Sequence, residues 1–332
     1  MKSTKKIVIL GKEILPGKTE ELNLDVAKLH TTTPIQVPVI VSRGQEDGPV
    51  LLLMAGMHGD EINGMEIIRR IIRKGLNKPI RGTVICIPIF NIFGFLNMSR
   101  ELPDGRDLNR CFPGSKTGSL ASQFAYHFMK EIAPITDYIV DFHTGAAQRS
   151  NFPQIRCVFR DEEAIQLAKV FNPPFIIHSS HIAKTIREAM HRRGKHFLLF
   201  EGGKTNSIDE FIIQEAIEGV KRLMNHLELR HFKLEKNDHQ PLMIKATKWL
   251  RATHSGMFLP IIKNGTRVQP GTILGLITDP FGKIEHKVKC SIHGYVFCVN
   301  EAPIVNKGDA IFNIGSAKEL VGEGLIHGAI ID

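Results

Sequence analysis

A histidine and a glutamate three residues apart follow one of the most apolar runs of the chain. The run Val50–Ala55 continues as G-M-H-G-D-E, which places His58 and Glu61 at the start of a predicted helix. Side chains three positions apart at a helix start can point at one spot. Imidazole nitrogens and carboxylate oxygens are both ligands that zinc accepts. Taken alone, the H-x-x-E spacing more often marks a chance or helix-capping pair.

A second apolar strand also ends in a histidine. The segment Y-I-V-D-F-H-T-G (residues 138–145) carries His143, with Asp141 two residues earlier on the same side of the strand. Asp141 is a candidate acceptor for the ring N–H of His143, a contact that orients metal-binding histidines. His58, Glu61 and His143 form a set that leaves a fourth position for water, as catalytic zinc requires. The alternative is that the two histidines are unrelated.

A carboxylate closes a third apolar strand. In F-L-L-F-E-G-G (residues 197–203), Glu201 follows four apolar residues and precedes two glycines. Burial raises the pKa of a carboxyl group towards neutrality, which suits a general base acting on a metal-activated water. The structural alternative is a capping or salt-bridged strand end.

Three arginines lie in a loop rich in glycine and proline, N-M-S-R-E-L-P-D-G-R-D-L-N-R-C-F-P-G (residues 97–114). Arg100, Arg106 and Arg110 have no helical or strand period that packing would explain. The arginine side chain offers a fixed fork of donors for a carboxylate or a developing oxyanion. The alternative for any one of them is a solvated loop.

From about residue 36 to residue 228, short apolar runs alternate with helical patterns, and these elements must position the residues named above. Strands are predicted at Gln36–Val41, Val50–Ala55, Thr83–Ile89, Asp137–Asp141, Ile155–Phe159, Phe175–His178 and His196–Phe200. Helices are predicted at Glu61–Lys74, Leu120–Ile132, Glu162–Phe171, Ala183–Arg193 and Ile208–Glu228. The alternation predicts an α/β fold with a mixed, largely parallel sheet flanked by helices.

A change in the sequence pattern near residue 229 predicts a domain boundary. Residues 1–228 are predicted to form the catalytic domain, and the charged, aperiodic segment 229–245 is predicted to be a linker. Residues 246–332 have short apolar runs separated by Gly and Pro, which indicates a small all-β, barrel-like domain. Two of its segments resemble the half-barrels of a lipoyl/biotinyl domain, but no Lys-Met pair marks a carrier. We expect a structural or oligomerising role.

Composition narrows the class of protein. The chain has 332 residues, of which 42% are hydrophobic, and a net charge of +9. Its basic residues form no stripe with interleaved aromatics, so nucleic-acid binding is not expected. No apolar run approaches the ~18 residues of a membrane span, and no signal-peptide core follows the N-terminus. Five scattered cysteines without a C-x-x-C pair suit a reducing compartment, so we expect a cytoplasmic protein.

Four motifs in order carry a family resemblance. H-x-x-E, D-L-N-R, D-F-H-T-G and E-G-G, together with the elements at residues 36–228, resemble the succinylglutamate desuccinylase/aspartoacylase group. Members of that group are zinc-dependent deacylases with a carboxypeptidase A-like fold. The resemblance therefore implies a cofactor, one Zn²⁺ per chain, and the liganding set is then His58, Glu61 and His143.

The resemblance also implies roles for other residues. Glu201 matches the base that activates water and later protonates the leaving amine, and Asn109 and Arg110 match the pair that binds the substrate's α-carboxylate. An arginine that polarises the scissile carbonyl is expected upstream of D-L-N-R. We favour Arg100 over Arg106, which adjoins Asp107.

Position alone adds three candidate substrate-binding residues after the zinc strand: Arg149, Asn151 and Arg156. The predicted function is hydrolysis of the amide of an N-acyl amino acid. A metallocarboxypeptidase acting on peptides and a metal-free binding or regulatory protein are the alternatives. The expected partner is a small-molecule substrate, with no nucleic acid and no membrane, and with a homo-oligomer open. The ligand set also suits divalent ions other than zinc.

Overall fold

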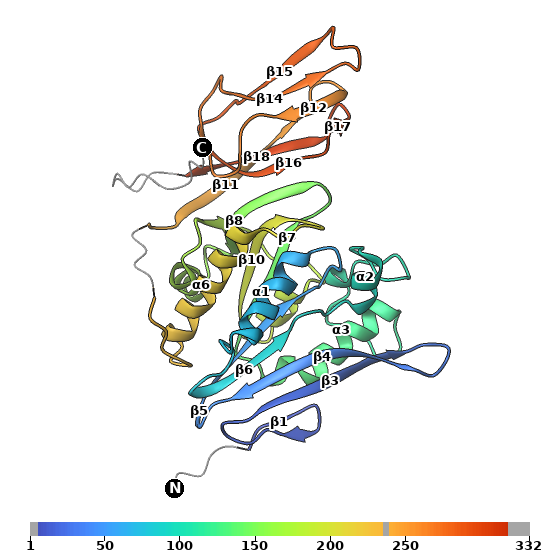
Figure 1. Cartoon of the computed structure of the whole chain (residues 1–332), viewed down its shortest axis with the longest axis vertical. Coiled ribbons are helices and arrows are strands. Elements are labelled where there is room, and N and C mark those ends of the chain that lie inside the picture. The colour runs from blue at the N-terminus through green and yellow to red at the C-terminus, as the bar shows by residue number, and fades with distance from the viewer. Residues whose placement is uncertain (1–5, 235–238, 318–332) are drawn as a thin grey trace.

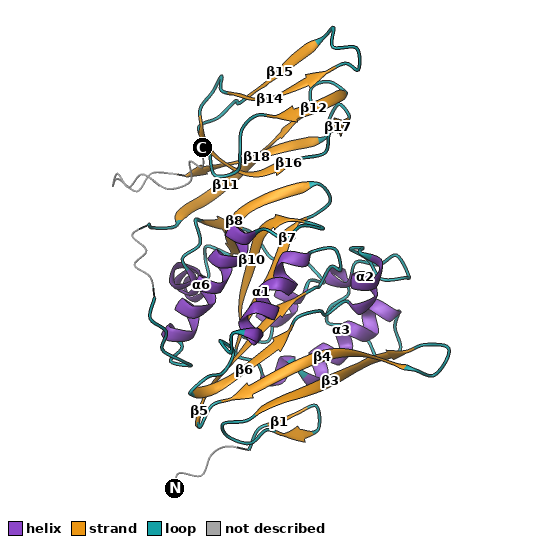
Figure 2. Ribbon diagram, in the orientation of Figure 1, coloured by secondary structure: helices purple, strands orange, loops and turns teal. Residues whose placement is uncertain are grey.

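The computed structural model describes residues 6–234 and 239–317. A long mixed sheet runs through these residues, with helices packed on both faces of its central part (Figures 1 and 2). Its strands are, in spatial order, β13 (Arg267–Val268), β16 (Gly294–Asn300), β18 (Ala310–Ala317), β11 (Leu242–Arg251), β9 (Phe175–His178), β8 (Arg149–Cys157), β10 (His196–Lys204), β7 (Tyr138–Gly145), β5 (Glu46–Ala55), β6 (Arg81–Ile87), β4 (Pro34–Arg43) and β3 (Thr19–Lys28).

The centre of the sheet is parallel. Strands β10, β7, β5 and β6 run in one direction, so their carboxyl ends meet at one edge. Every residue from Val50 to Ala55 is buried, because helices cover both faces of these strands, and this accounts for an unbroken apolar run. The predicted mixed sheet flanked by helices is confirmed.

Two apolar cores lie on opposite faces of the sheet. Leu51, Leu53 and Ala55 pack towards the helices α1, α4 and α6, whereas Leu52 and Met54 pack towards α3 and α5. This alternation follows from the two-residue period of a strand. The helices are α1 (Ile62–Arg73), α2 (Ile92–Asn97), α3 (Leu120–Glu131), α4 (Glu162–Phe171), α5 (Ile186–His191) and α6 (Glu210–His226), with 3₁₀ turns at Leu108–Arg110 and Ala133–Ile135.

The predicted elements are present with shifted ends. Helix α5 begins at Ile186 rather than Ala183, because Thr185 caps it by accepting a hydrogen bond from the Glu188 N–H. Strand β8 begins at Arg149, six residues before the predicted start, since its first half is polar and gives no apolar run. It runs antiparallel to β10. The sequence analysis also missed β3 and α2.

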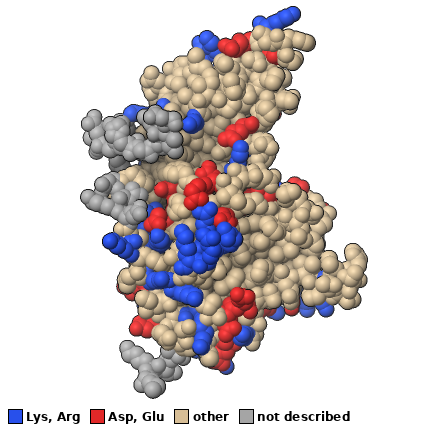
Figure 3. Space-filling model, viewed as in Figure 1, with Lys and Arg blue, Asp and Glu red and all other residues tan. Residues whose placement is uncertain are grey.

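Basic side chains gather over α1, as Figure 3 shows. Arg69 and Arg70 both donate hydrogen bonds to Glu66 one turn earlier, and Arg70 also reaches Glu210 of α6 at 2.6 Å. The cluster therefore ties two packed helices together at the surface. In the part of the chain that the structure describes, no helix is both long and apolar enough to cross a membrane.

The C-terminal strands continue the central sheet. Strand β11 is parallel to β9, and β16 is antiparallel to the start of β8. A second sheet has the order β15 (Glu285–Lys289), β14 (Ile273–Thr278), β12 (Gly256–Pro260) and β17 (Ile304–Val305). A third, two-stranded sheet near the N-terminus pairs β1 (Val8–Ile9) with β2 (Lys12–Glu13). Described residues 246–317 contain strands and turns without helix.

The predicted linker at 229–245 ends inside a strand, because β11 begins at Leu242. Residues 235–238 of that segment, residues 318–332 of the predicted β domain and residues 1–5 of the predicted catalytic domain lie outside the described residues.

Candidate active site

The loop after β5 brings His58 and Glu61 to the carboxyl edge of the sheet. Gly56 turns the chain with φ +66°, a value that side chains rarely adopt. At Gly59 an added Cβ would lie 1.7 Å from the carbonyl carbon of Gly94, so only glycine allows this close approach to α2. Glu61 then occupies the N-cap position of α1. The strand-turn-helix arrangement expected from the sequence is present.

His58, Glu61 and His143 come together as predicted. His58 Nδ1 lies 2.7 Å from Glu61 Oε1, and His143 Nδ1 lies 2.9 Å from Glu61 Oε2. All three residues are at most 4% exposed. One possible ligand atom from each falls within 4.8 Å of the others. Two imidazoles therefore converge on one carboxylate at the ends of adjacent strands β5 and β7.

Further carboxylates orient the two rings from outside. Asp141 is fully buried, and its Oδ2 lies 2.8 Å from His143 Nε2. Asp107 Oδ1 lies 3.2 Å from His58 Nε2. Each ring thus presents Nδ1 to the centre of the cluster and Nε2 to a supporting carboxylate. Such outer contacts hold ligating histidines in place in metal sites.

The electrostatics of the cluster are those of a cation site. Burial opposes charge on His58 and His143, but the carboxylates of Glu61, Asp107 and Asp141 outweigh it and raise both pKa values. Burial likewise opposes charge on Glu61, but the two histidines lower its pKa below the usual range. The carboxylates therefore stabilise positive charge at this place, whether the imidazoles or a bound cation carries it.

The donor set fits a divalent ion of borderline softness. Two imidazole nitrogens and a carboxylate, buried and already converged, are the ligands of catalytic zinc sites with an open fourth position. Within residues 6–234 and 239–317, it is the one place where ligand atoms of three or more His, Cys, Asp or Glu residues lie within 4.8 Å of one another. His58, Glu61 and His143 would hold the ion.

Glu201 stands beside the cluster. It is in register with His143 on the neighbouring parallel strand, so their positions along the sheet match. Its side chain is 12% exposed and faces the pocket. Asn151 donates a hydrogen bond from Nδ2 to Glu201 Oε2 at 2.9 Å, and Arg156 Nη1 lies 3.4 Å from Oε1. Two side chains of β8 therefore fix the direction of this carboxylate.

The structure separates the two candidate arginines of the loop. Arg100 lines the pocket, donates to Asp107 at 2.8 Å and lies 3.2 Å from His58 Nδ1. Arg106 is exposed, pairs with Asp104 at 3.1 Å and does not line the pocket. The difference arises because Arg100 forms an ion pair with Asp107, the residue before the 3₁₀ turn, and this contact holds Arg100 at the pocket.

Asn109 and Arg110 lie on that 3₁₀ turn and both line the pocket. Asn109 Oδ1 accepts a hydrogen bond from the Ile186 N–H, which fixes the turn against the start of α5. Arg110 is exposed and donates to the Asn109 carbonyl at 2.7 Å. The guanidinium of Arg110 is accordingly accessible to a ligand.

Sequence reasoning missed Arg187, Trp249 and Cys298, which also line the pocket. Arg187 is buried, and its hydrogen bonds go to Ser179 Oγ and to the carbonyls of Arg156 and Ser180. Burial lowers the pKa of Arg187 to about 10, helped by the nearby Arg156.

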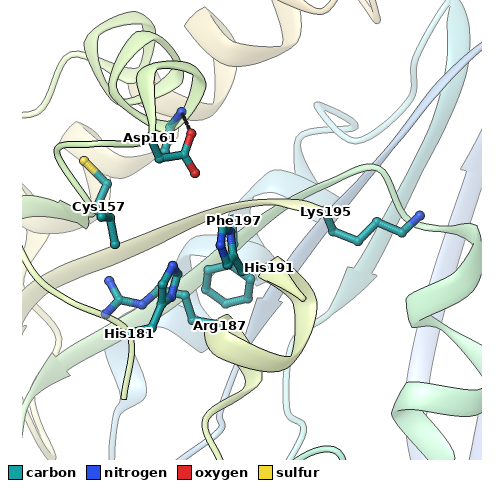
Figure 4. A pocket seen from close by; sticks show the side chains of 9 residues that line it. Cys157, Asp161, His181, Arg187, His191, Lys195 and Phe197 are labelled. Carbon is teal, nitrogen blue, oxygen red and sulfur yellow. Dashed lines mark hydrogen bonds between the residues drawn. The ribbon is translucent and has the colours of Figure 1, made fainter. Parts of the chain in front are cut away.

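On its other side Arg187 borders a smaller cavity with His181 and His191 (Figure 4). No local pattern distinguishes Arg187 from the solvated arginines of other helices. For Trp249 the one signal in the sequence is that it is the single tryptophan of the chain.

The pocket has a volume of about 250 Å³ and a basic lining. Five arginines line it, against the carboxyl groups of Glu61, Asp141 and Glu201; the arginines are Arg100, Arg110, Arg149, Arg156 and Arg187. Such an excess of guanidinium groups attracts an anionic small molecule. The candidate residues Arg149, Asn151 and Arg156 all belong to this lining, whereas Arg106 does not.

Comparison with known proteins agrees with this fold. The model of the succinylglutamate desuccinylase/aspartoacylase catalytic domain matches residues 47–227, more than half of the chain, so the chain belongs to this family. The resemblance predicted from the four motifs is confirmed. The chain is also 27% identical over 304 residues to N-alpha-acetyl-L-2,4-diaminobutyric acid deacetylase of Halomonas elongata, covering 87% of this chain and 88% of the relative.

Solved structures share the fold at lower identity. A succinylglutamate desuccinylase/aspartoacylase from Rhodobacter sphaeroides superposes with a TM-score of 0.79 at 21% identity, over 91% of this chain and 96% of that one. The product-bound ectoine utilization protein EutE (DoeB) from Ruegeria pomeroyi has a TM-score of 0.78 at 22% identity, over 90% and 94%. Both matches extend beyond the catalytic region into the C-terminal strands.

Proposed function

We propose that the protein is a zinc-dependent hydrolase that removes the acyl group from an N-acyl amino acid. The observation that carries the proposal is Glu201, which Asn151 holds beside the His58–Glu61–His143 cluster in an arginine-lined pocket. The name of the Halomonas elongata relative, a deacetylase of an N-acetyl amino acid, supports the same reaction class.

In this proposal one zinc ion is held by His58, Glu61 and His143. When bound, zinc lowers the pKa of a water molecule towards ~7 and polarises a carbonyl oxygen. Asp141 contacts Nε2 of His143, and Asp107 contacts Nε2 of His58, so that the Nδ1 atom of each ring faces the ion. The carboxylates also balance the charge that the ion brings into a buried site.

Glu201 acts as general base and then as general acid. Its carboxylate accepts the proton of the attacking water and returns it to the nitrogen of the leaving amine as the amide bond breaks. Asn151 contacts one oxygen of the carboxylate and Arg156 the other, which orients the group and leaves lone pairs on both oxygens to accept a proton.

Arginines bind the charges of substrate and transition state. Arg100 lies next to His58 and donates to the oxyanion that develops on the scissile carbonyl. Asn109 and Arg110 bind the α-carboxylate, with the Asn109 side chain already oriented by the start of α5. The basic lining of the pocket favours such an anionic substrate over a neutral one.

A metallocarboxypeptidase is the second candidate, because the same residues would cut a terminal peptide bond. The proposal favours a deacylase because Trp249 and Cys298, from the C-terminal strands, form a wall of the pocket. A peptide substrate needs an open path for the chain that precedes the scissile bond. A metal-free binding or regulatory protein is the remaining alternative, and zinc content after purification without chelators distinguishes it.

The test is primary-amine release by zinc-loaded protein from a panel of N-acyl amino acids and short peptides. Release from the N-acyl amino acids supports the deacylase. Release from peptides alone replaces it with a carboxypeptidase. Absence of release from both, together with zinc far below one ion per chain, contradicts the proposal.

The remaining parts of the proposal concern organisation. They are a catalytic domain at 1–228 and a small β domain at 246–332 that is not a carrier. We also retain a cytoplasmic location and a possible homo-oligomer. Fractionation of the native cell and sedimentation of the purified protein test these two points.

A further inference from the structure

Arg149 and Trp249 meet where the C-terminal strands join the central sheet. Arg149 begins β8, directly after the turn that follows the His143 strand, and its backbone pairs with Asn300 of β16. Trp249 lies on β11. The guanidinium carbon of Arg149 lies 5.5 Å from the centre of the Trp249 ring, within the range of a cation–π contact. Both side chains line the pocket.

Arg149 differs from its neighbours in what holds it. Arg100 pairs with Asp107, and Arg156 pairs with Glu201. Among the described residues, no carboxylate forms an ion pair with Arg149, and its buried Nε has no hydrogen-bond partner. An aromatic face holds a guanidinium without neutralising its charge. The donor edge of Arg149 is therefore available to an anion.

The backbone under Arg149 is firmly held. An added Cβ at Gly145 would lie 2.2 Å from the Arg149 carbonyl oxygen, so the turn is tight. Asn264 donates to the Ser150 carbonyl at 2.8 Å, and the Glu301 N–H donates to the Gln148 carbonyl at 2.8 Å. Strand pairing and these contacts hold the turn in place independently of the indole, so that removal of the indole frees the guanidinium rather than the backbone.

Arg149 lies on a different part of the pocket wall from Asn109 and Arg110, the residues proposed to bind the α-carboxylate. Asn109 and Arg110 are fixed against the start of α5, whereas Arg149 is fixed against β16 and β11. Both residues line the same pocket from different elements, so one substrate molecule can present different groups to them.

We propose that Trp249 is a positioning residue that holds Arg149 in the pocket, and that Arg149 there binds a carboxylate of the substrate other than the α-carboxylate. This inference rests on the proposed function. The second carboxylate belongs either to the end of the acyl group or to the amino-acid side chain. The C-terminal strands thereby take part in substrate selection.

The kinetic test compares substrates that differ by one carboxylate. N-acetylalanine is compared with N-succinylalanine, which adds the charge to the acyl group, and with N-acetylaspartate, which adds it to the side chain. For the substrate that Arg149 binds, Arg149→Gln should raise KM roughly 10- to 100-fold. Trp249→Ala should raise it roughly three- to tenfold, and Trp249→Phe, which keeps an aromatic face, should restore most of the loss.

N-acetylalanine should show little change in KM in these variants, and kcat should change little for every substrate. The matched control is Arg251→Gln, which removes an exposed arginine of the same strand β11 that lies outside the pocket. Equal effects on all three substrates, or effects no larger than those of the control, would overturn the inference.

A binding test separates this inference from the proposed function. Because the chain has one tryptophan, its fluorescence reports on Arg149 directly. Titration with succinate or aspartate should change the emission of the parent protein and leave that of Arg149→Gln unchanged. If the parent hydrolyses no N-acyl amino acid but this pattern holds, the proposed function fails and the anion subsite stands. Identical titrations in parent and variant overturn the subsite.

Discussion

Replacing Asp141 by Asn tests whether the outer carboxylate supports metal binding. Asp141 is fully buried, and its Oδ2 contacts His143 Nε2 at 2.8 Å, while its Oδ1 has no hydrogen-bond partner. An asparagine of the same shape can keep its oxygen at the imidazole and place the amide nitrogen at the unpartnered position. The substitution therefore removes the charge and retains the geometry.

The expected cost is a loss of about 10- to 100-fold in zinc affinity, the range found when such outer contacts are removed. That factor corresponds to about 1.4–2.8 kcal/mol. Two changes act in the same direction: the contact to the imidazole becomes weaker, and the site loses a negative charge that attracts a divalent cation.

The assay is competition for zinc between the protein and a chromogenic chelator at neutral pH. Asp104→Asn serves as the control, because it makes the same chemical change in the exposed loop that holds Arg106. Circular dichroism verifies that both variants are folded. Zinc affinity equal to that of the parent in a folded Asp141→Asn protein would refute the role assigned to Asp141.

Three further outcomes are expected. Glu201→Gln should still bind zinc but lose roughly 10²- to 10⁴-fold in kcat, because the amide cannot accept a proton; comparable activity would contradict the base assignment. Arg100→Gln should lower kcat roughly 10²- to 10³-fold, whereas Arg106→Gln should stay within about twofold of the parent, and steady-state kinetics that reverse this order would exchange the two roles.

The third concerns Glu66, whose pKa falls to about 2 because Arg69 and Arg70 donate to its carboxylate. A lowered pKa means that the ionised form stabilises the fold above pH ~4.5 and that this contribution is lost as the pH falls towards 2. Glu66→Gln should therefore reduce the free energy of unfolding by about 1 kcal/mol at pH 7. Urea titrations at pH 7 and pH 2.5 should show a smaller difference at the lower pH, and a pH-independent difference would refute the linkage.

The site residues that sequence reasoning found share one property. His58, His143 and Glu201 each stand within three residues of an apolar run, so their position at the carboxyl edge of a parallel sheet follows from local pattern alone. The hydrogen bond from Asn151 to Glu201 was beyond local pattern, because it depends on the antiparallel pairing of β8 with β10.

Long-range pairing also explains what was missed. Trp249 reaches the pocket because β11 pairs with β9, an arrangement that brings together residues about seventy positions apart in the sequence. The polar start of β8 gave no strand signal, since it lies at the junction with β16 rather than in an apolar core. Arg187 is recognised only by its burial and by the lack of a carboxylate partner among the described residues, and both require coordinates.

The backbone pairing of β11 with β9 and of β16 with β8 has a consequence for motion. Two segments of the molecule that share hydrogen-bonded strands cannot swing apart as a hinged lid without breaking that ladder. The wall that contains Trp249 is then a fixed boundary during turnover. Residues 98–107, which bring Arg100 to the pocket, form a loop without regular secondary structure and share no such ladder with the C-terminal strands. Any movement of this loop during turnover would therefore shift Arg100 relative to that fixed wall.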